Sequence, residues 1–515
     1  MAEDGIPGQD VGNNAISNKL KMKKCVIIGS GLGGLSTGCI LARNGYEVTV
    51  LEQGGQVGGC LQCFRRGDAV FDTGMHYIGS ADPGQTLHTM LKYLGVDKDI
   101  RLMRLDPAGY DIIAFQGERY RFANGREGFV ETLCRQFPQS RDELYRYYDI
   151  IKLVGSSSYM HSLNRNVDVN INAEYQMRSV NDVIDSTVSD ECLRQVLAGV
   201  LPLYAGEKDR TPFSTHAMIT DFYNQSAFRI VGGSGMVADS LAASIRGMGG
   251  QVLVRRKAVK VECDETSATA VITADGERFP ADLVISAIHP SCTMELVDSH
   301  RFRPAYRRRI ENLRNTTSAF TVYLKFRKNT VRYMNSNLYC YRGDKTWGCE
   351  KYDDATWPKS LLYMHFCHEA NPEFALTGEI LTYMSFDETR RWLGTEIGRR
   401  GEDYEEFKRN KAEKAISALE ETVPGIKGCI EKFYTSTPLT YYDYTGIPDG
   451  AMYGVAKEVN ALGAGTVSSK TRIPNLLLTG QSIICHGMLG VIAGSFMTCA
   501  EVLTTDEIFA QLKSV

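Results

Sequence analysis

The stretch Val26-Ile-Ile-Gly29-Ser-Gly31-Leu-Gly-Gly34, close to the start of the chain, decides the fold. Its apolar run at 26–28 is typical of a buried parallel strand. Gly29, Gly31 and Gly34 follow with the G-x-G-x-x-G spacing: the first allows a tight turn, the second lets backbone approach a pyrophosphate, and the third allows close helix–strand packing. The helix that follows would direct its N-terminus at that pyrophosphate, where free N–H groups and the helix dipole favour an anion.

The residues after this helix complete a nucleotide-binding unit. Gly45 ends the helix, residues 46–51 are expected to form a second strand, and Glu52 closes that strand. An acid at this place accepts hydrogen bonds from an adenosine ribose. A glycine triad alone is weak evidence, but strand, helix, strand and acid in this order predict dinucleotide binding.

A second glycine pair decides which dinucleotide is expected. Gly58-Gly59 comes soon after Glu52, and Phe71-Asp-Thr-Gly74-Met75-His-Tyr-Ile-Gly follows. An extended flavin cofactor needs further backbone free of side chains, whereas an NAD-dependent dehydrogenase does not, so the expected cofactor is FAD. The pair resembles the second glycine motif of amine oxidase and phytoene desaturase flavoproteins, although amine oxidases usually continue with Arg where this chain has Cys60. The residues expected at the cofactor are Gly29, Ser30, Gly31, Gly33, Gly34, Glu52, Gln53, Gly58, Gly59, Cys60, Gly74, Met75, Val259, Ala287, Gly480, Gln481, Gly490, Val491 and Ile492.

Composition narrows the class of protein further. The chain has 515 residues, enough for two or three domains, and its 58 Lys and Arg against 61 Asp and Glu give no basis for nucleic-acid binding. Its 14 cysteines are scattered singly, which favours a reducing compartment. Residues 1–21 are expected to be a disordered leader. The apolar stretches 25–42 and 473–500 are rich in glycine and fit strand–turn–helix units better than membrane spans. We expect a cytoplasmic protein, with peripheral membrane attachment as an alternative.

The order of patterns predicts two interleaved domains. Segments 22–105, 225–295 and 434–515 form a discontinuous, Rossmann-like α/β domain that binds FAD. Segments 106–224 and 296–433 form an inserted α+β domain over the flavin, with helices in the first segment and an antiparallel sheet in the second. Residues 319–326, 360–366 and 379–386 are strand-like and suit a sheet with one covered face, followed by a charged helix at about 404–421.

The last segment carries the most specific motifs. Residues 472–481 form a strand running into Thr-Gly-Gln, and Gly490-Val-Ile-Ala-Gly494 is expected to open the final helix. This block resembles the carotenoid and retinoid oxidoreductases, a family that includes phytoene desaturases, carotenoid isomerases and retinol saturases. The resemblance is greatest to the retinol saturases and extends over most of the chain. Its motifs are residues 71–79, 212–216, 232–234, 436–440, 450–454 and 479–481. The chain departs from the saturases at Ser482, where they usually carry an acid, and at Ile230-Val231, which replaces their Tyr-Pro.

The resemblance implies an FAD-dependent oxidoreductase that acts on CH–CH groups of a long apolar isoprenoid or polyene. Saturation of one double bond is the first interpretation, and desaturation or isomerisation the second. A disulfide or amine oxidoreductase and a non-catalytic flavin-binding membrane adaptor are more remote alternatives. The candidate catalytic residues are His216, His76 and Tyr77. His216 is expected in a loop between helical parts of the second domain. One of the two histidines could donate a proton to a substrate carbon, but a hydrogen-bonded structural histidine is the favoured interpretation.

Two other patterns were weighed. Cys60 and Cys63 suggest a redox disulfide, but flavin disulfide reductases carry a second glycine fingerprint for NADPH. The only mid-chain candidate, Gly232 to Gly235, lacks a preceding buried strand and a terminal acid. An external electron donor or reductase is therefore expected. Cys485-His486 has no partner cluster, so no metal is expected. The sequence leaves the oligomeric state open.

Overall fold

The glycine-rich stretch joins β1 (Lys24–Ile28) to α1 (Leu32–Arg43) in the middle of a five-stranded sheet. The computed structural model describes residues 23–370, 372–459, 461 and 466–515, so the expected leader at 1–21 lies outside the described residues. The strand order is β10-β2-β1-β14-β20, and all four pairings are parallel. The other strands of this sheet are β2 (Glu47–Leu51), β10 (Gln251–Leu253), β14 (Leu283–Ser286) and β20 (Leu476–Leu478).

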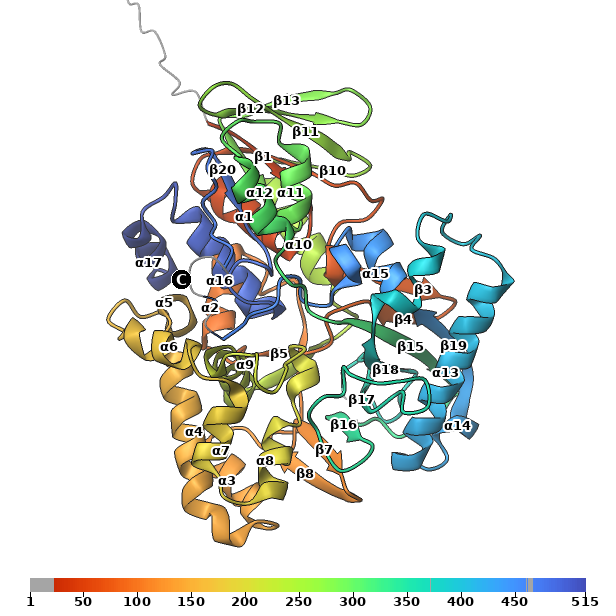
Figure 1. Ribbon diagram of the computed structural model, residues 1–515. Helices are drawn as coiled ribbons and strands as arrows, with labels where there is room; N and C mark the ends of the chain where they lie inside the picture. The colour runs from red at the N-terminus through yellow and green to blue at the C-terminus, as the bar shows by residue number, and fades with distance from the viewer. Residues whose placement is uncertain (1–22, 371, 460, 462–465) are drawn as a thin grey trace, which may run out of the picture.

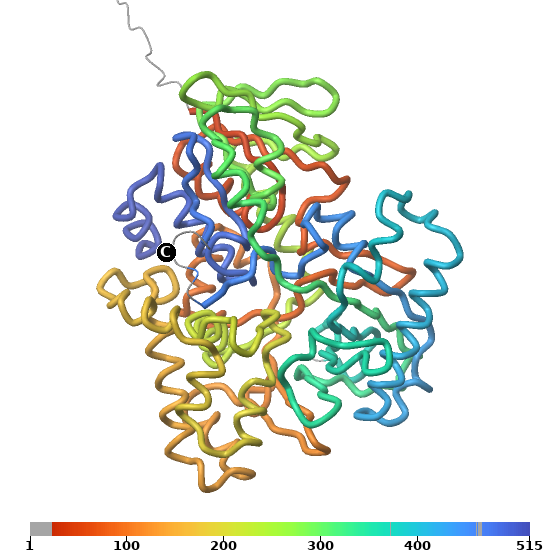
Figure 2. Tube along the Cα trace, viewed as in Figure 1, coloured from red at the N-terminus to blue at the C-terminus, as the bar shows by residue number. Residues whose placement is uncertain are grey.

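This parallel sheet gathers its strands from three distant parts of the chain. β1 and β2 come from the first hundred residues, β10 and β14 from the middle, and β20 from the last forty. Helix α1 packs against α10 (Gly235–Gly247) and against α16 (Gly487–Cys499). Figure 2 shows the red and blue ends of the trace side by side in this part of the molecule. The runs Cys25–Ile28 and Leu283–Ser286 are fully buried. Strands that are buried on both faces need mainly apolar side chains, which explains the apolar sequence of these runs.

A second, seven-stranded sheet lies at the other end of the molecule (Figure 1). The pairings are antiparallel except that β16 pairs with β7 in parallel, so the sheet is mixed where a purely antiparallel one was expected. β19 runs on to Ser436, past the expected domain boundary at 433; we propose the boundary after Ser436. In sheet order, the strands are β19 (Ile430–Ser436), β15 (Ser318–Phe326), β18 (Thr377–Met384), β17 (Ser360–His365), β16 (Asn337–Tyr341), β7 (Asp111–Phe115) and β8 (Glu118–Phe122).

The two faces of this sheet pack against different partners. Alternate residues of a strand point to opposite faces. Ile380 packs in the cluster that the long helix α13 (Glu402–Thr422) completes with Ala415, whereas Leu381 packs toward the helical part of the chain. One face is therefore covered by a single charged helix, and the other is turned toward the centre of the molecule.

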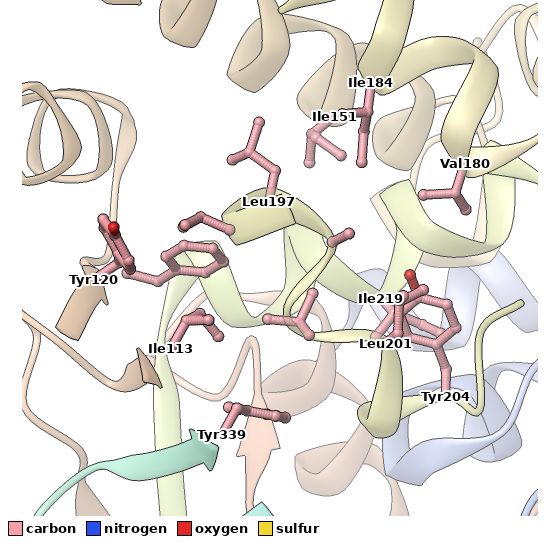
Figure 3. Packing of buried hydrophobic residues seen from close by; sticks show 14 of the residues in the cluster. Ile113, Tyr120, Ile151, Val180, Ile184, Leu197, Leu201, Tyr204, Ile219 and Tyr339 are labelled. Carbon is pink, nitrogen blue, oxygen red and sulfur yellow. The ribbon is translucent and has the colours of Figure 1, made fainter. Parts of the chain in front are cut away.

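Residues 126–225 are mostly helical and share one core with the inner face of the sheet. Ile151, Ile184, Leu197 and Ile219 come from four different helices and meet Ile113 of β7 (Figure 3). The apolar stripe Phe129, Leu133 and Phe137 belongs to the same buried cluster. The helices are α3 (Arg126–Cys134), α4 (Arg141–Ser156), α5 (Tyr159–Ser162), α6 (Val169–Gln176), α7 (Val180–Thr187), α8 (Glu191–Ala198) and α9 (Phe213–Gln225).

Three further small sheets are present among the described residues. β9 is fully buried and directly precedes Gly232, although no strand was expected there. It pairs antiparallel with β5 and β6, so it does not start a second nucleotide-binding unit of parallel strands. The small sheets are β11 (Ala258–Cys263), β12 (Ala268–Thr273) and β13 (Arg278–Pro280); β3 (Cys63–Arg66) and β4 (Ala69–Asp72); and β5 (Ile78–Gly79), β9 (Ala227–Ile230) and β6 (Leu102–Arg104).

The remaining helices lie around these sheets. They are α2 (Thr86–Leu94), α11 (Pro290–Leu296), α12 (Pro304–Glu311), α14 (Ile426–Cys429), α15 (Pro438–Thr445) and α17 (Thr505–Lys513). Within the described part of the chain, no helix has both the length and the apolar character needed to cross a bilayer.

Candidate cofactor and substrate site

A large cavity opens at the carboxyl ends of the parallel strands, where ligands of open α/β sheets bind. It encloses about 1790 Å³, counting its open mouth. The chain segments around it include the loop after β1, the end of β2, the second glycine pair, the turn after β20 and the start of α16. Of the residues expected at the cofactor, its lining contains Gly29, Ser30, Gly31, Gly33, Glu52, Gln53, Gly58, Gly59, Cys60, Gly74, Met75, Ala287, Gly480, Gln481 and Val491.

The glycines of the first loop have different surroundings. A methyl group on Gly31 would meet no atom within 4 Å, because this position faces the cavity. On Gly33 it would lie 2.8 Å from the Cα of Gly480, and on Gly34 2.1 Å from the carbonyl oxygen of Gly29. Gly31 thus leaves space for a ligand, whereas Gly33 and Gly34 allow backbone segments to touch. Gly34 does not line the cavity.

Glu52 is held in place at the end of β2. One carboxylate oxygen accepts hydrogen bonds from the backbone N–H of Ser30 at 3.0 Å and from its hydroxyl at 2.6 Å. The other accepts from the N–H of Gly54 at 2.7 Å. The carboxylate lines the cavity and retains lone pairs for further donors, such as the two hydroxyls of a ribose.

The second glycine pair touches the first loop. Gly58 and Gly59 have φ angles of +116° and +56°, in the region that L side chains rarely adopt. A methyl group on Gly59 would lie 3.2 Å from the Cα of Gly31. Two stretches without side chains therefore meet on one side of the cavity.

Two helices begin at the cavity without side-chain caps. The N-cap residues Gly31 of α1 and His486 of α16 make no side-chain hydrogen bond to the first turn. Uncapped N–H groups at a helix N-terminus stabilise negative charge. The N-terminus of α1 fits the pyrophosphate, and the N-terminus of α16 fits a negatively charged flavin ring. Together with the carboxylate of Glu52 and the glycine backbone free of side chains, these N–H donors fit FAD.

Besides Gly34, three expected cofactor residues do not line this cavity. α16 begins at Gly487, three residues before the expected start, so its free N–H groups do not belong to Gly490 or Ile492. Ile492 is buried on the helix side away from the cavity, and Gly490 lines a neighbouring cavity. Val259 is 43% exposed on β11, while the preceding Lys257 and Ala258 face the cavity. α17 follows α16, so α16 is not the last helix either.

A second, mainly apolar cavity adjoins the first. Counting its open mouth, it has a volume of about 710 Å³, and it shares Gly74, Met75, Tyr453, Gly487 and Met488 with the first cavity. The apolar side chains that line it come from the turn at 201–203, from α9, from the inner face of the seven-stranded sheet and from α16. They are Leu203, Ile219, Phe222, Leu362, Leu381 and Leu489. A ligand there would lie directly beside the flavin end of the cofactor cavity.

Two of the three candidate catalytic residues line this second cavity. His76 has a side chain that is 12% exposed, and burial lowers its pKa to about 3. Tyr77 is buried, and its hydroxyl is bonded to Tyr339 at 2.7 Å and donates to Asp111 at 3.2 Å. The hydroxyl of Tyr77 is therefore already engaged, and His76 is the better placed of the two for proton transfer.

His216 lies in neither cavity. It is fully buried in α9, with Nε2 bonded to the Tyr147 hydroxyl and Nδ1 to the Tyr204 hydroxyl, both at 2.6 Å. It was expected in a loop, and the structure places it in a helix inside the core. Because both ring nitrogens have partners, the structure argues against His216 as the proton donor.

One residue that lines the second cavity and one buried residue beside His76 were not predicted. His486 lines this cavity, stacks on Tyr453 with ring centroids 4.1 Å apart, and its Nε2 has no hydrogen-bond partner among the described residues. Glu379 lies in β18 with a carboxylate oxygen 3.2 Å from Nδ1 of His76. A charged residue in an otherwise apolar strand is a signal that could have indicated Glu379.

The fold and the site define an FAD-binding oxidoreductase. Residues 32–400 match the family described as flavin containing amine oxidoreductase, and the chain belongs to that family. The expected fold class and the FAD cofactor are thereby confirmed.

Curated relatives extend over nearly the whole chain. The chain is 26% identical to the human protein all-trans-retinol 13,14-reductase, covering 98% of this chain and 88% of the relative. It is 22% identical to prolycopene isomerase 1, chloroplastic, of an Oncidium hybrid cultivar, covering 93% and 84%. The expected resemblance to retinoid and carotenoid oxidoreductases is confirmed. Among solved structures, an oxidoreductase from Methanosarcina mazei has the same fold, with a TM-score of 0.64, 18% identity and coverage of 92% and 99%.

Proposed function

We propose that the protein reduces one carbon–carbon double bond of a long apolar isoprenoid or polyene, as a retinol saturase does. The apolar cavity beside the flavin end of the cofactor cavity carries this proposal. Four curated relatives named all-trans-retinol 13,14-reductase, which match 93% or more of this chain, support the reductive direction.

The lining of the second cavity favours an apolar substrate. Burying apolar surface contributes roughly 25 cal/mol per Å², less the cost of association and ordering. Leu362 and Leu381 of the sheet, with Leu489 of α16, exclude water from the bound chain. With few polar groups to recognise, discrimination among polyenes of similar width should be weak.

Bound FAD supplies the two-electron chemistry, and the protein must supply one proton. His76 lines the cavity at the residue that follows Met75, which borders both cavities. The backbone carbonyl of His76 accepts a hydrogen bond from buried Arg229 at 3.3 Å, which fixes its position. We assign His76 as the group that holds the proton for a substrate carbon, and we propose that electrons arrive from a separate donor.

Desaturation or isomerisation of a polyene is the second candidate function. Prolycopene isomerases and a phytoene desaturase are among the relatives, and the same apolar cavity suits their substrates. These reactions differ from saturation in the mass of the product, so one experiment separates them.

The test uses purified protein reduced by dithionite under anaerobic conditions and then mixed with all-trans-retinol or a larger carotenoid. A product heavier by two hydrogens, formed as the flavin reoxidises, supports the saturase. Loss of two hydrogens by the oxidised protein would make it a desaturase, and unchanged mass with altered retention an isomerase. The polyene proposal fails if none of these substrates reacts and an amine or a thiol reduces the flavin instead.

A further inference from the structure

Glu379 is a buried carboxyl group on the face of the seven-stranded sheet that lines the second cavity. It lies two residues before Leu381 in β18, on the same face of the strand. Leu381 lines the cavity together with its cross-strand partner Leu362. The side chain of Glu379 is only 1% exposed. Burial of a carboxyl group is costly unless it is neutral or paired, so its surroundings need an explanation.

The nearest ionisable partner of Glu379 is His76. The distance from Glu379 Oε2 to His76 Nδ1 is 3.2 Å. Neither carboxyl oxygen, nor Nδ1 of His76, has a hydrogen bond of good geometry within the described part of the chain. Because Nδ1 is turned to Glu379, the opposite side of the ring, with Nε2, is left for the cavity that His76 lines.

Other ionisable groups surround this pair. Asp72 raises the pKa of Glu379 and Arg229 lowers it. A negative charge on Glu379 would in turn raise the pKa of three nearby tyrosines, Tyr323, Tyr441 and Tyr453. Arg229 is 2% exposed and is the cation that acts on His76, Asp72 and Asp111 as well. Asp72, Asp111 and Glu379 are thus three buried acids that share one buried cation, Arg229, and this excess of acids favours a protonated acid among them.

Protonation states follow from this burial. Burial raises the pKa of Glu379 well above its ordinary value, and Arg229 offsets only part of that effect. Burial also lowers the pKa of His76 to about 3, so its imidazole is neutral near pH 7. The pair is then a carboxylic acid facing a neutral ring nitrogen, and the proton available to the cavity is stored on Glu379.

We propose that Glu379 and His76 form a proton relay, in which Glu379 recharges the ring of His76 as His76 protonates the substrate. This inference rests on the proposed reduction of a double bond. One carbon receives a hydrogen with its electron pair from the reduced cofactor, and the neighbouring carbon takes the proton from Nε2 of His76. The O–H bond of Glu379 breaks as the N–H bond forms at Nδ1. Glu379 is left as a carboxylate near Arg229. When product leaves, water that enters the cavity returns a proton to Nε2 of His76, and the proton on Nδ1 passes back to Glu379.

The kinetic test compares Glu379→Gln with wild type in single turnover. Pre-reduced holoenzyme is mixed with all-trans-retinol, and flavin reoxidation is followed. Because an amide of the same shape cannot transfer the proton, reoxidation should slow by about 100-fold or more, while the flavin spectrum and the retinol concentration at half-saturation stay unchanged. Glu379→Asp should recover part of the rate. The control is Glu373→Gln, an exposed carboxyl that pairs with Arg332, and it should react at the wild-type rate.

An infrared test does not depend on activity. In wild type near pH 7, a carbonyl band of a protonated carboxylic acid should shift in D₂O, disappear in Glu379→Gln and move in Glu379→Asp. If Glu379→Gln retains the band and the wild-type rate while wild type reduces retinol, the relay is wrong and the proposed function stands. If wild type reduces no polyene although the band is present, the proposed function fails and the relay fails with it.

Discussion

At the scale of single residues, neighbouring glycines have opposite roles. Gly31 faces open space in the cavity, and Gly34 is in contact with the carbonyl of Gly29. A substitution at the first should affect the ligand, and one at the second should affect the fold.

Replacing Gly31 with Val should give a folded protein without FAD. The new side chain would occupy the space left for the pyrophosphate, and its Cβ would have no protein atom within 4 Å. Gly34→Val should instead lower stability by several kcal/mol, because a Cβ would lie 2.1 Å from the Gly29 oxygen. Flavin absorbance and thermal unfolding distinguish the two. A yellow Gly31→Val protein with a normal spectrum would place the pyrophosphate elsewhere.

Asp111 should make stability depend on pH. It is buried, accepts a hydrogen bond from Asn337 at 2.7 Å, and burial raises its pKa to about 7, against about 3.9 in an unfolded chain. The folded state holds the proton more tightly, so this contribution is full below about pH 4 and is lost as pH rises through about 7. The melting temperature of wild type minus that of Asp111→Asn should therefore fall across this window.

The control for Asp111 is an exposed acid with the opposite shift. Backbone N–H groups of Thr266 and Ser267 lower the pKa of Asp264. Its stabilising contribution is present above the unfolded pKa and is lost as pH falls below it. The melting temperature of wild type minus that of Asp264→Asn should thus rise with pH in the acidic range. A difference for Asp111→Asn that is flat from pH 4 to 8 would contradict the raised pKa.

Cofactor residues were predictable from the sequence where their role depends on their spacing within one continuous motif. The loop at 29–34 and Glu52 belong to one continuous motif, so spacing alone indicated them. Glu379 and His76 are 303 positions apart and meet only because β18 places a carboxyl opposite the loop after β4. His216 was chosen for its motif, but the hydroxyls of Tyr147 and Tyr204 that engage it are not visible in that motif.

At the scale of elements, the N-terminus of α16 depends on one close contact. A Cβ on Gly490 would lie 2.8 Å from the Cβ of Cys485 and 3.0 Å from its carbonyl group, in the turn that starts the helix. A Cβ on Gly494, one turn later, would only touch Ile484 at 3.9 Å.

Gly490→Ala should therefore displace this turn, weaken FAD binding and destabilise the protein by about 1–3 kcal/mol. Gly494→Ala should keep FAD and be neutral or stabilising by up to about 1 kcal/mol, because alanine is the better helix former. Thermal unfolding and the FAD-to-protein ratio after gel filtration measure both. If the two variants had the same melting temperature and the same FAD content, the turn at Cys485 would not be what positions the N-terminus of α16.

Element prediction succeeded for long periodic runs and failed for short pairings. The helix expected at 404–421 exists as Glu402–Thr422, and the strand expected at 319–326 as Ser318–Phe326. β9 has four residues and gains its stability from β5 and β6, which are more than 100 positions away. The parallel pairing of β16 with β7 is equally long-range, so nothing in the local pattern indicated it.

At the scale of the whole molecule, one nucleotide-binding sheet is present among the described residues. The glycines at 232–235 follow β9, which lies in a small antiparallel sheet. Among the described residues, that sheet has no parallel strand that could follow these glycines and end in an acid. The described residues thus form a place for FAD and no second Rossmann unit for NADH or NADPH.

NADH or NADPH alone should bleach the flavin slowly under anaerobic conditions, whereas dithionite should do so within mixing times. Neither nucleotide should show saturation, because the described residues form no second nucleotide-binding sheet. Stopped-flow absorbance with increasing nucleotide checks this. Fast bleaching that saturates with either nucleotide would show that the electrons need no separate donor.

The place of β20 in the parallel sheet has a consequence for how the protein is made. β20 and the start of α16, which border the cofactor cavity, are encoded in the last forty residues. On the ribosome, β1 and β2 emerge hundreds of residues earlier and must wait for this partner. The complete FAD site can therefore form only once β20 and the start of α16 have left the ribosome. Since a ligand stabilises only the state that binds it, cellular FAD supply would act as a checkpoint on chains synthesised past α16 and not on shorter nascent ones.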